Sequence, residues 1–525
     1  MANLVELPKR ANNGLSEDSL AKRYGFKLGA GVFGLPVGLA QQWLVTRALG
    51  PSGYGSYSFL NAFFSEVIAF FDSGTSIGFY AKLCARPNEP GLIVFYWRLA
   101  ATIVATLFIG VGALLIAGLG GWLWPAVSPA SVVLALLCAV GLWLTMIAGK
   151  IVDAYGCTTQ GEKVRLVSRF VGLAGFGILF AVGALTLDSI FVAQVVISAL
   201  LLWLWHQVLK GAGFSLAPRV VLPGRLAGLY GREFWQYSHP LLVYTFVGML
   251  AGLADRWLLQ RFSGSIEQGL YGLAFQIGSI GLLFSSAMVP LLARDFAQAH
   301  QSEDRERISA SYARNIPRLY ALSACLGVFM AVESDRIAVV IGGDQFAHAG
   351  VATSLMCLYP IHQTYGQMNG SLFYATGQTH LYRNLGLFNI ALGLALTVWL
   401  LGPPQIGGLS LGSIGLAVKM VLTQLIAVNV QLWIICRQLG LSFLGFATQQ
   451  LVIVVGFAII AAGARVAGDL MGPIALVQLA TAGALYAGLI IVVTWILPGI
   501  AGVSRPELAA LAARIYRYRA PTEGR

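Results

Sequence analysis

QWLVTRALGPSGYGSY, residues 42–57, decides the fold, because RWLLQRFSGSIEQGLY, residues 256–271, repeats its pattern in the second half of the chain. In each copy we expect an apolar helix to end at an arginine, a glycine-containing turn to follow, and a tyrosine to open the next apolar helix. A repeat of this kind predicts two related lobes with the functional site between them. The identical pairs are Trp43/Trp257, Leu44/Leu258, Arg47/Arg261, Gly50/Gly264, Gly55/Gly269 and Tyr57/Tyr271.

The composition indicates a membrane protein. Of 525 residues, 57% are hydrophobic and 11% charged, and the mean hydropathy is +0.75, outside the range of soluble domains. A net charge of +12 would suggest nucleic acid in a soluble protein, but no nucleic-acid signature accompanies it. The first 25 residues lack the apolar core of a cleavable signal peptide. The six cysteines stand singly, without metal-ligand spacing, and we expect no disulfide among them. We also expect no metal and no cofactor.

Apolar runs long enough to cross a hydrocarbon core predict an all-α polytopic protein with 14 transmembrane helices. These are two pseudo-symmetric six-helix lobes and a C-terminal pair. The predicted parts are an N-terminal segment (1–25), an N-lobe (26–209), a linker (210–233), a C-lobe (234–436), the last helix pair (437–500) and a basic tail (501–525). The spans begin near Phe26, Gly55, Leu92, Ala126, Val164, Ser189, Phe234, Gly269, Ile316, Gly350, His380, Ser410, Ala447 and Gly472.

Lysine and arginine predict the orientation. With both termini in the cytoplasm, all but six of the 34 Lys and Arg residues fall on the cytoplasmic side, including Lys150, Lys163, Arg165 and Arg169, as the positive-inside rule predicts. The loops on the other side are short, which leaves little room for the catalytic groups of a membrane enzyme. No phosphate-binding loop for ATP is present. The exceptions to the charge rule are Arg47, Arg261, Arg336 and Arg465 outside, and Arg256 and Lys419 within spans.

Ionisable residues inside spans are costly, and they generally face a wet cavity or a partner. The predicted set is Glu66, Asp72, Asp255, Arg256, His362 and Lys419. Helical geometry places Glu66, His362 and Lys419 near the midplane.

The second span carries a polar stripe on one face, formed by Ser58, Asn61, Ser65, Asp72 and Ser76. Such a stripe lines a cavity or bonds to a neighbouring helix. Glu66 points away from it by about 100°.

The repeat places Asp255 and Arg256 opposite Gln41 and Gln42, so these four residues would face one another across a cleft if a pseudo-two-fold axis relates the lobes. A buried structural ion pair is the alternative.

Arg47 and Arg261 at helix ends either steer substrate or anchor in the headgroups. Lys419 lacks an acidic neighbour in its own span, which favours a cavity that attracts anions; a pair with Glu66 or Asp255 is the alternative. His362 and Tyr365 share a face with Asn369, a combination suited to a sugar or to a hydrogen-bonded structural histidine.

The runs RALGPSGYGSYSF (47–59) and FFDSGTSIGF (70–79) resemble the first two helices of Wzx-like oligosaccharide-lipid flippases. These belong to the multidrug/oligosaccharidyl-lipid/polysaccharide exporter superfamily. The resemblance implies a non-enzymatic flippase that moves undecaprenyl-diphosphate-linked oligosaccharide from the inner to the outer leaflet of the bacterial inner membrane by alternating access. It serves surface polysaccharide synthesis, with a polysaccharide polymerase and chain-length proteins as possible partners.

Two alternatives share this scaffold. A lipid-linked peptidoglycan precursor flippase is expected to carry arginines in the first two spans, where this chain has Gln41, Gln42, Glu66 and Asp72. A cation-coupled multidrug antiporter favours carboxylates without cations in its cavity, against which Arg256 and Lys419 speak. Glu66 and Asp72 are the candidates for binding a coupling proton or sodium ion.

Overall fold

A computed structural model describes residues 20–501 and residue 505. These residues form sixteen α-helices and four short 3-10 helices, and none of them lies in a strand. The short elements are α4 (Gly120–Leu123), η1 (Ser279–Gly281), η2 (Asp344–Ala349), η3 (Pro404–Ile406) and η4 (Pro498–Ala501).

Ten helical segments of the described chain are long and apolar enough to cross a membrane. This confirms an all-α multi-pass membrane protein. The other predicted spans fall on α1 (Leu20–Asp72), α9 (Leu282–Gln301) and α12 (Gly350–Ala375), and the count of fourteen stays a prediction. The ten segments are α3 (Pro90–Ile116), α5 (Pro129–Ala154), α6 (Thr158–Ala181), α7 (Leu187–Gly211), Leu242–Gly281, α10 (Arg305–Val332), α13 (Thr379–Leu401), α14 (Gly412–Leu439), α15 (Phe443–Asp469) and α16 (Ala475–Ile496).

The repeat appears in the backbone as two matched kinks. Helix α1 is interrupted at Gly50 (φ 62°, ψ −179°) and α8 (Gly224–Gly278) at Gly264 (φ 81°, ψ −179°). A positive φ favours glycine because a β-carbon would clash with the backbone. The sequence predicted that the first helix of each copy ends at Arg47 or Arg261. In the structure each helix instead ends three residues later, at one of the paired glycines.

The described chain divides into two compact units, Met1–Arg261 and Phe262–Arg525, called unit 1 and unit 2 below. The division falls within α8, just before Gly264. The first part of α8, which was expected to belong to the C-lobe, therefore packs with unit 1. The predicted domain limits at residues 209, 233 and 436 were derived from the sequence repeat and not from contacts between helices. These limits stay a prediction.

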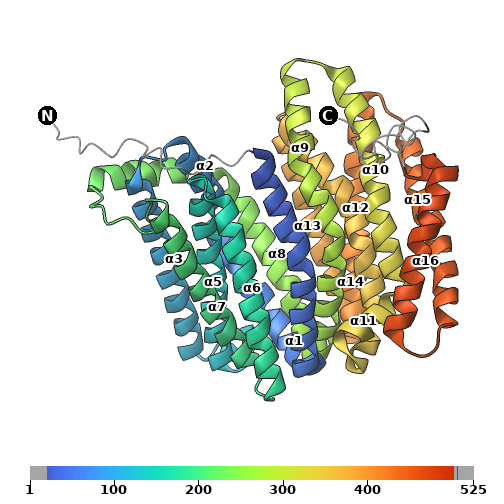
Figure 1. The fold of residues 1–525 in the computed structure, drawn as a ribbon, viewed down its shortest axis with the longest axis horizontal. Helices are drawn as coiled ribbons and strands as arrows, with labels where there is room; N and C mark the ends of the chain where they lie inside the picture. The colour runs from blue at the N-terminus through green and yellow to red at the C-terminus, as the bar shows by residue number, and fades with distance from the viewer. Residues whose placement is uncertain (1–19, 502–504, 506–525) are drawn as a thin grey trace, which may run out of the picture. The chain divides into compact units, whose positions relative to one another are not determined.

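In unit 1, α5 packs along α7, α1 along α6, and α6 along α7 (Figure 1). Large apolar side chains such as Phe59, Leu136, Ile147 and Trp205 fill the core between these helices. Helix α2 (Thr75–Ala85) follows a sharp break at Ser73 and Gly74, both with positive φ.

In unit 2, α12 is the central helix, and it contacts α14, α10 and α9. Tyr312, Tyr365, Phe373 and Leu432 lie in the core around it. Helix α15 packs on α10 and on α16, and α11 (Ser334–Gly342) lies against α12 and α16. The C-terminal helix pair is thus attached to the rest of unit 2 through α10 and α11.

Candidate functional site

Three of the predicted intramembrane charges meet in unit 1. A β-carbon on Gly252 would lie 2.8 Å from Cδ of Glu66, so the carboxyl group rests against the α8 backbone one turn before Arg256. Arg256 and Asp255 both lie within electrostatic range of Glu66. A carboxylate and a guanidinium on facing helices provide opposite charges in one intramembrane site.

Gln42 joins the same site through Tyr54. The Tyr54 side chain is buried on the other side of the Gly50 kink, hydrogen-bonds with Gln42 and lies within electrostatic range of Arg256. Nε2 of Gln42 is enclosed without a hydrogen-bond partner among the described residues. Helix α1 therefore supplies three polar groups, Gln42, Tyr54 and Glu66, which face the first part of α8.

Asp72 occupies a different place from Glu66. Its carboxylate accepts hydrogen bonds from Ser76 Oγ (2.8 Å), Trp143 Nε1 (3.1 Å) and Tyr96 OH (3.3 Å), and Thr75 Oγ1 lies 3.5 Å away. Lys150 Nζ donates to Ser76 Oγ at 2.6 Å. Four elements, α1, α2, α3 and α5, are thereby tied to one carboxylate.

This network changes the expected polar stripe. Helix α1 ends at Asp72, and Ser76 belongs to α2 beyond the break. Asp72 is therefore enclosed by fixed donors rather than open toward a cavity. Asn61 is half-buried on α1.

The paired arginines of the repeat are both exposed. The guanidinium of Arg47 lies 4.7 Å from the centre of the Trp43 ring, which is itself 38% exposed. An arginine stacked on a tryptophan at a helix end fits an anchor in the membrane interface. Substrate steering by Arg47 and Arg261 stays a prediction.

Lys419 of unit 2 is 8% exposed. Its Cε would lie 3.0 Å from a β-carbon on Gly393, so the side chain of this lysine crosses to α13 where that helix lacks a side chain. Thr423 Oγ1 donates to the Lys419 carbonyl oxygen at 2.8 Å.

His362 and Tyr365 meet around Tyr320 of α10. The centre of the Tyr320 ring lies 5.8 Å from the centre of the His362 ring and 5.0 Å from the centre of the Tyr365 ring. Nδ1 of His362 and the Tyr320 hydroxyl are enclosed without a hydrogen-bond partner among the described residues. Tyr365 is 1% exposed in the core of unit 2, so it supports the packing of α12 and does not face an open surface here.

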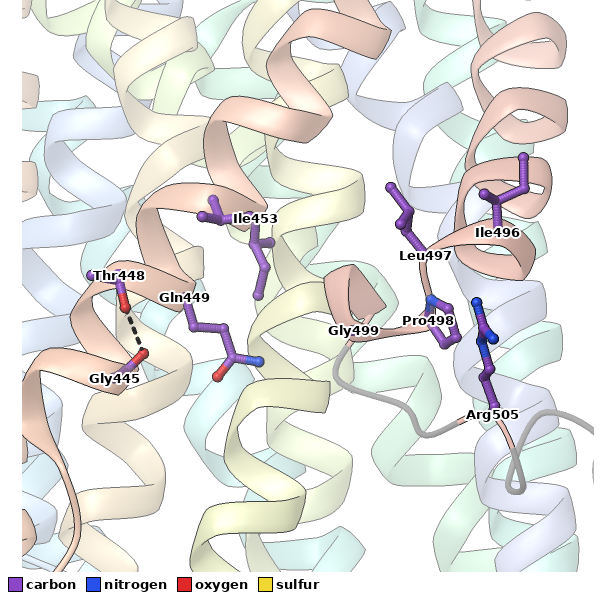
Figure 2. A pocket seen from close by; sticks show the side chains of 10 residues that line it. Gly445, Thr448, Gln449, Ile453, Ile496, Leu497, Pro498, Gly499 and Arg505 are labelled. Atoms are coloured by element: carbon purple, nitrogen blue, oxygen red, sulfur yellow. Dashed lines mark hydrogen bonds between the residues drawn. The ribbon is translucent and has the colours of Figure 1, made fainter.

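At one end of α15 and α16 the described residues form a cavity of about 630 Å³ (Figure 2). Its walls are mostly apolar, and Thr448, Gln449 and Arg505 add polar groups. None of the predicted site residues lines it. The other lining residues are Gly445, Val452, Ile453, Ile496, Leu497, Pro498 and Gly499.

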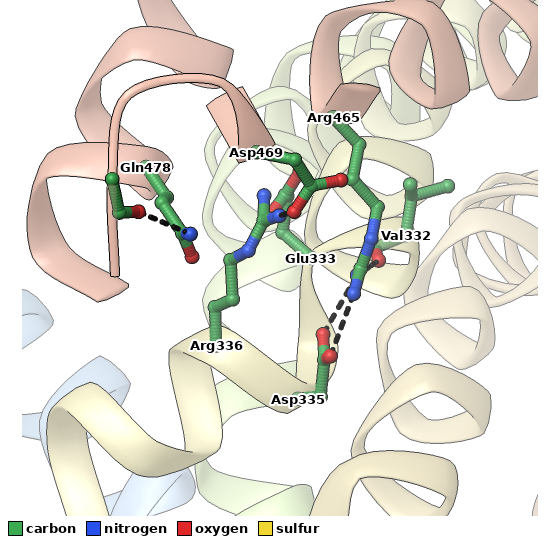
Figure 3. Close-up of polar contacts among 8 residues, drawn as sticks. Val332, Glu333, Asp335, Arg336, Arg465, Asp469 and Gln478 are labelled. Atoms are coloured by element: carbon green, nitrogen blue, oxygen red, sulfur yellow. Dashed lines mark hydrogen bonds and ion pairs between the residues drawn. The ribbon is translucent and has the colours of Figure 1, made fainter. Parts of the chain in front are cut away.

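The opposite end of α15 is held by ion pairs (Figure 3). Arg336 of α11 pairs with Glu333 at 2.7 Å and with Asp469 of α15. Arg465 of α15 donates from both guanidinium nitrogens to Asp335 at 2.7 Å, and these bonds hold the pKa of Asp335 below its usual value. Arg336 and Arg465, predicted as outside residues, thus attach the C-terminal pair to unit 2.

Sequence reasoning missed one cation. Arg169 was assigned to a cytoplasmic segment, but α6 begins at Thr158, so Arg169 lies well inside that helix. The available signal was an apolar stretch, VGLAGFGILFA (171–181), that is short for a complete span. A membrane-spanning helix of about 20 residues that ends at Ala181 must begin well before Val171, and it therefore includes Arg169.

The fold is similar to that of solved membrane transporters, among them two described as members of the MOP superfamily. The lipid II flippase MurJ, in an inward closed conformation, matches 90% of this chain and 99% of its own, with a TM-score of 0.62 and 11% identity. An inward-facing multidrug resistance MATE family transporter matches 77% of this chain and 94% of its own, with a TM-score of 0.62 and 13% identity.

The MATE multidrug transporter DinF-BH covers 83% of this chain and 100% of its own, with a TM-score of 0.55 and 17% identity. No family model matches the sequence, and no curated protein matches it. At these identities the likeness concerns the fold.

Proposed function

We propose that this protein is a flippase that moves a polyprenyl-diphosphate-linked oligosaccharide from the inner to the outer leaflet of the bacterial inner membrane by alternating access. Both termini lie in the cytoplasm. The product serves synthesis of a surface polysaccharide. A polysaccharide polymerase and chain-length proteins are the partners that would use it.

The observation that carries this proposal is the extent of the shared fold. The lipid II flippase covers 90% of this chain, whereas the two MATE transporters cover 77% and 83%. A fold shared with a lipid II flippase over nearly the whole chain supports a flippase of lipid-linked cargo. The runs at residues 47–59 and 70–79 direct the choice among flippases toward the oligosaccharide-lipid branch.

The charges in the spans suit such a cargo. Arg256 in unit 1 and Lys419 in unit 2 supply cations at membrane depth, and a diphosphate needs cationic donors. Moving about two negative charges outward across an inside-negative membrane is favoured by about 2.3 kcal/mol per charge per 100 mV. The membrane potential therefore assists the loaded step.

Glu66 is the better candidate for ion coupling. It is half-buried beside Arg256 and Asp255, whereas Asp72 accepts hydrogen bonds from fixed donors. A proton or sodium ion that binds at Glu66 changes the charge beside Arg256. This change of charge drives the empty carrier back to the conformation that is open to the cytoplasm.

Proteoliposomes test the function directly. Protein is reconstituted with a fluorescent polyprenyl-diphosphate oligosaccharide, and an external glycosidase or quencher measures transfer between leaflets. We expect protein-dependent transfer that an imposed membrane potential accelerates. Transfer at the rate of protein-free vesicles would contradict the proposal.

Two alternatives give different results in the same assay. A peptidoglycan precursor flippase transfers lipid II in preference to other lipid-linked oligosaccharides. A multidrug antiporter transfers a cationic dye against a cation gradient and leaves both lipids in place. In cells, deletion of the gene is a further test. Accumulation of lipid-linked repeat units inside the deletion strain supports a flippase for surface polysaccharide.

A further inference from the structure

Arg169 lies where α1 and α6 pack together in unit 1. A β-carbon on Gly34 of α1 would overlap Nη1 of Arg169 and lie 3.0 Å from its Cζ. The guanidinium therefore occupies the space that a side chain at position 34 would fill. The glycine at position 34 leaves room for the Arg169 guanidinium against α1.

The position of this arginine is inside the membrane-spanning part of α6. It follows Thr158 by eleven residues and precedes Ala181 by twelve, which corresponds to about 16 Å and about 18 Å along the helix axis. Arginine side chains in helices point back toward the helix start. With the proposed orientation, the guanidinium lies in the cytoplasmic half of the membrane.

Within the described part of the chain, no carboxylate neutralises Arg169. The structure shows no ion pair or hydrogen bond of its side chain there, and the residue is exposed. Arg165, one turn earlier, pairs with Glu162 at 2.9 Å and lies over the Trp205 ring. Arg165 is thus accounted for by packing and by an ion pair, whereas the Arg169 residue, seated on Gly34, is still exposed.

A second donor lies along the same pair of helices. Nε2 of Gln41 would be 3.1 Å from a β-carbon on Gly172 of α6. One glycine on each helix, Gly34 and Gly172, thus makes room for a polar side chain from the other. A guanidinium and an amide along one pair of packed helices offer hydrogen-bond donors to an anion with several oxygens.

We propose that Arg169, seated on Gly34 and assisted by Gln41, binds the phosphate groups of the polyprenyl-linked cargo as it enters from the cytoplasmic leaflet. This inference rests on the proposed function. Guanidinium suits this role because its planar fork pairs with two phosphate oxygens at once, and it stays charged inside the membrane. Snorkelling to lipid headgroups is the competing role for an arginine at this depth.

Binding to purified protein in nanodiscs of zwitterionic lipid separates these roles. The probe is a fluorescent polyprenyl-diphosphate oligosaccharide, with the monophosphate as a second probe. Arg169→Gln is expected to weaken diphosphate binding by about tenfold, the order produced by loss of one charge-assisted hydrogen bond. Arg169→Lys is expected to recover part of the loss.

Gly34→Leu tests the geometry without changing charge, because it displaces the guanidinium from its seat. We expect it to weaken binding as Arg169→Gln does. Arg98→Gln is the matched control, since Arg98 is an exposed arginine on α3, and it should leave binding unchanged. Size-exclusion profiles and thermal unfolding establish that each variant is folded.

Wild-type affinity in both Arg169→Gln and Gly34→Leu overturns the inference. A second arm adds anionic phospholipid to the nanodiscs and measures lipid retention by native mass spectrometry. Loss of phospholipid retention with unchanged cargo binding assigns Arg169 to headgroups and also overturns it. Failure of wild-type protein to bind or transfer the cargo contradicts the proposed function instead.

Discussion

Glu66 of α1 rests against Gly252 of α8, so close that a β-carbon on the glycine would lie 2.8 Å from the carboxyl carbon. These residues are far apart in the sequence, and one turn beyond Gly252 the same helix carries Arg256. The carboxylate therefore reaches its position beside a cation because α8 lacks a side chain there.

Gly252→Ala is expected to displace the Glu66 carboxylate and to lower transfer of the lipid-linked cargo by about tenfold, as loss of a charge-assisted contact implies. The measurement is the proteoliposome transfer rate. Gly248→Ala is the control, since a β-carbon there meets open space. Equal rates in the two variants would contradict a functional role for this contact.

Asp72→Asn is expected to destabilise the protein rather than to alter ion dependence. The amide would place an N–H group among the donors of Ser76, Tyr96 and Trp143, and a buried unsatisfied group costs about 1–3 kcal/mol. Thermal unfolding in detergent measures this, with Asp344→Asn at an exposed position as control. Unchanged stability together with lost ion dependence would instead assign coupling to Asp72.

Gly264→Ala is expected to destabilise the kink in α8 by about 1–3 kcal/mol, because Gly264 has φ 81° and ψ −179°, a backbone conformation that is essentially restricted to glycine. A β-carbon there meets nothing within 4 Å, so the penalty comes from the backbone alone. Gly248→Ala within the same helix should stabilise by about 0.5–1 kcal/mol. Thermal unfolding of both variants gives the comparison, and equal shifts would refute the backbone argument.

Arg336→Met is expected to lower stability strongly, by about 3–5 kcal/mol, because it leaves Glu333 buried without its cation. Glu333 is 0% exposed and Arg336 7%. Arg465→Met removes a more exposed pair, with side chains 31% and 51% exposed, and should cost about 1 kcal/mol or less. Similar losses in both variants would show that burial does not set the strength of these pairs.

The sequence by itself determined the helical, membrane-spanning character of the chain and the two matched glycines. Apolar run length and the repeat are properties of neighbouring residues, and the conformations of Gly50 and Gly264 are decided locally. The same local reasoning selected Glu66, Arg256, Gln42 and Lys419 as polar groups in spans, since hydropathy alone makes them exceptional.

Only the tertiary structure decided which side chains meet. It joined Glu66 to Gly252, enclosed Asp72 among donors from three other helices, buried Tyr365 in a core and seated Arg169 on Gly34. Each of these contacts joins different helices whose spacing and rotation depend on the packing of the whole unit. Periodicity along one helix sets the direction of a side chain, but the partner in that direction is set by the neighbouring helices.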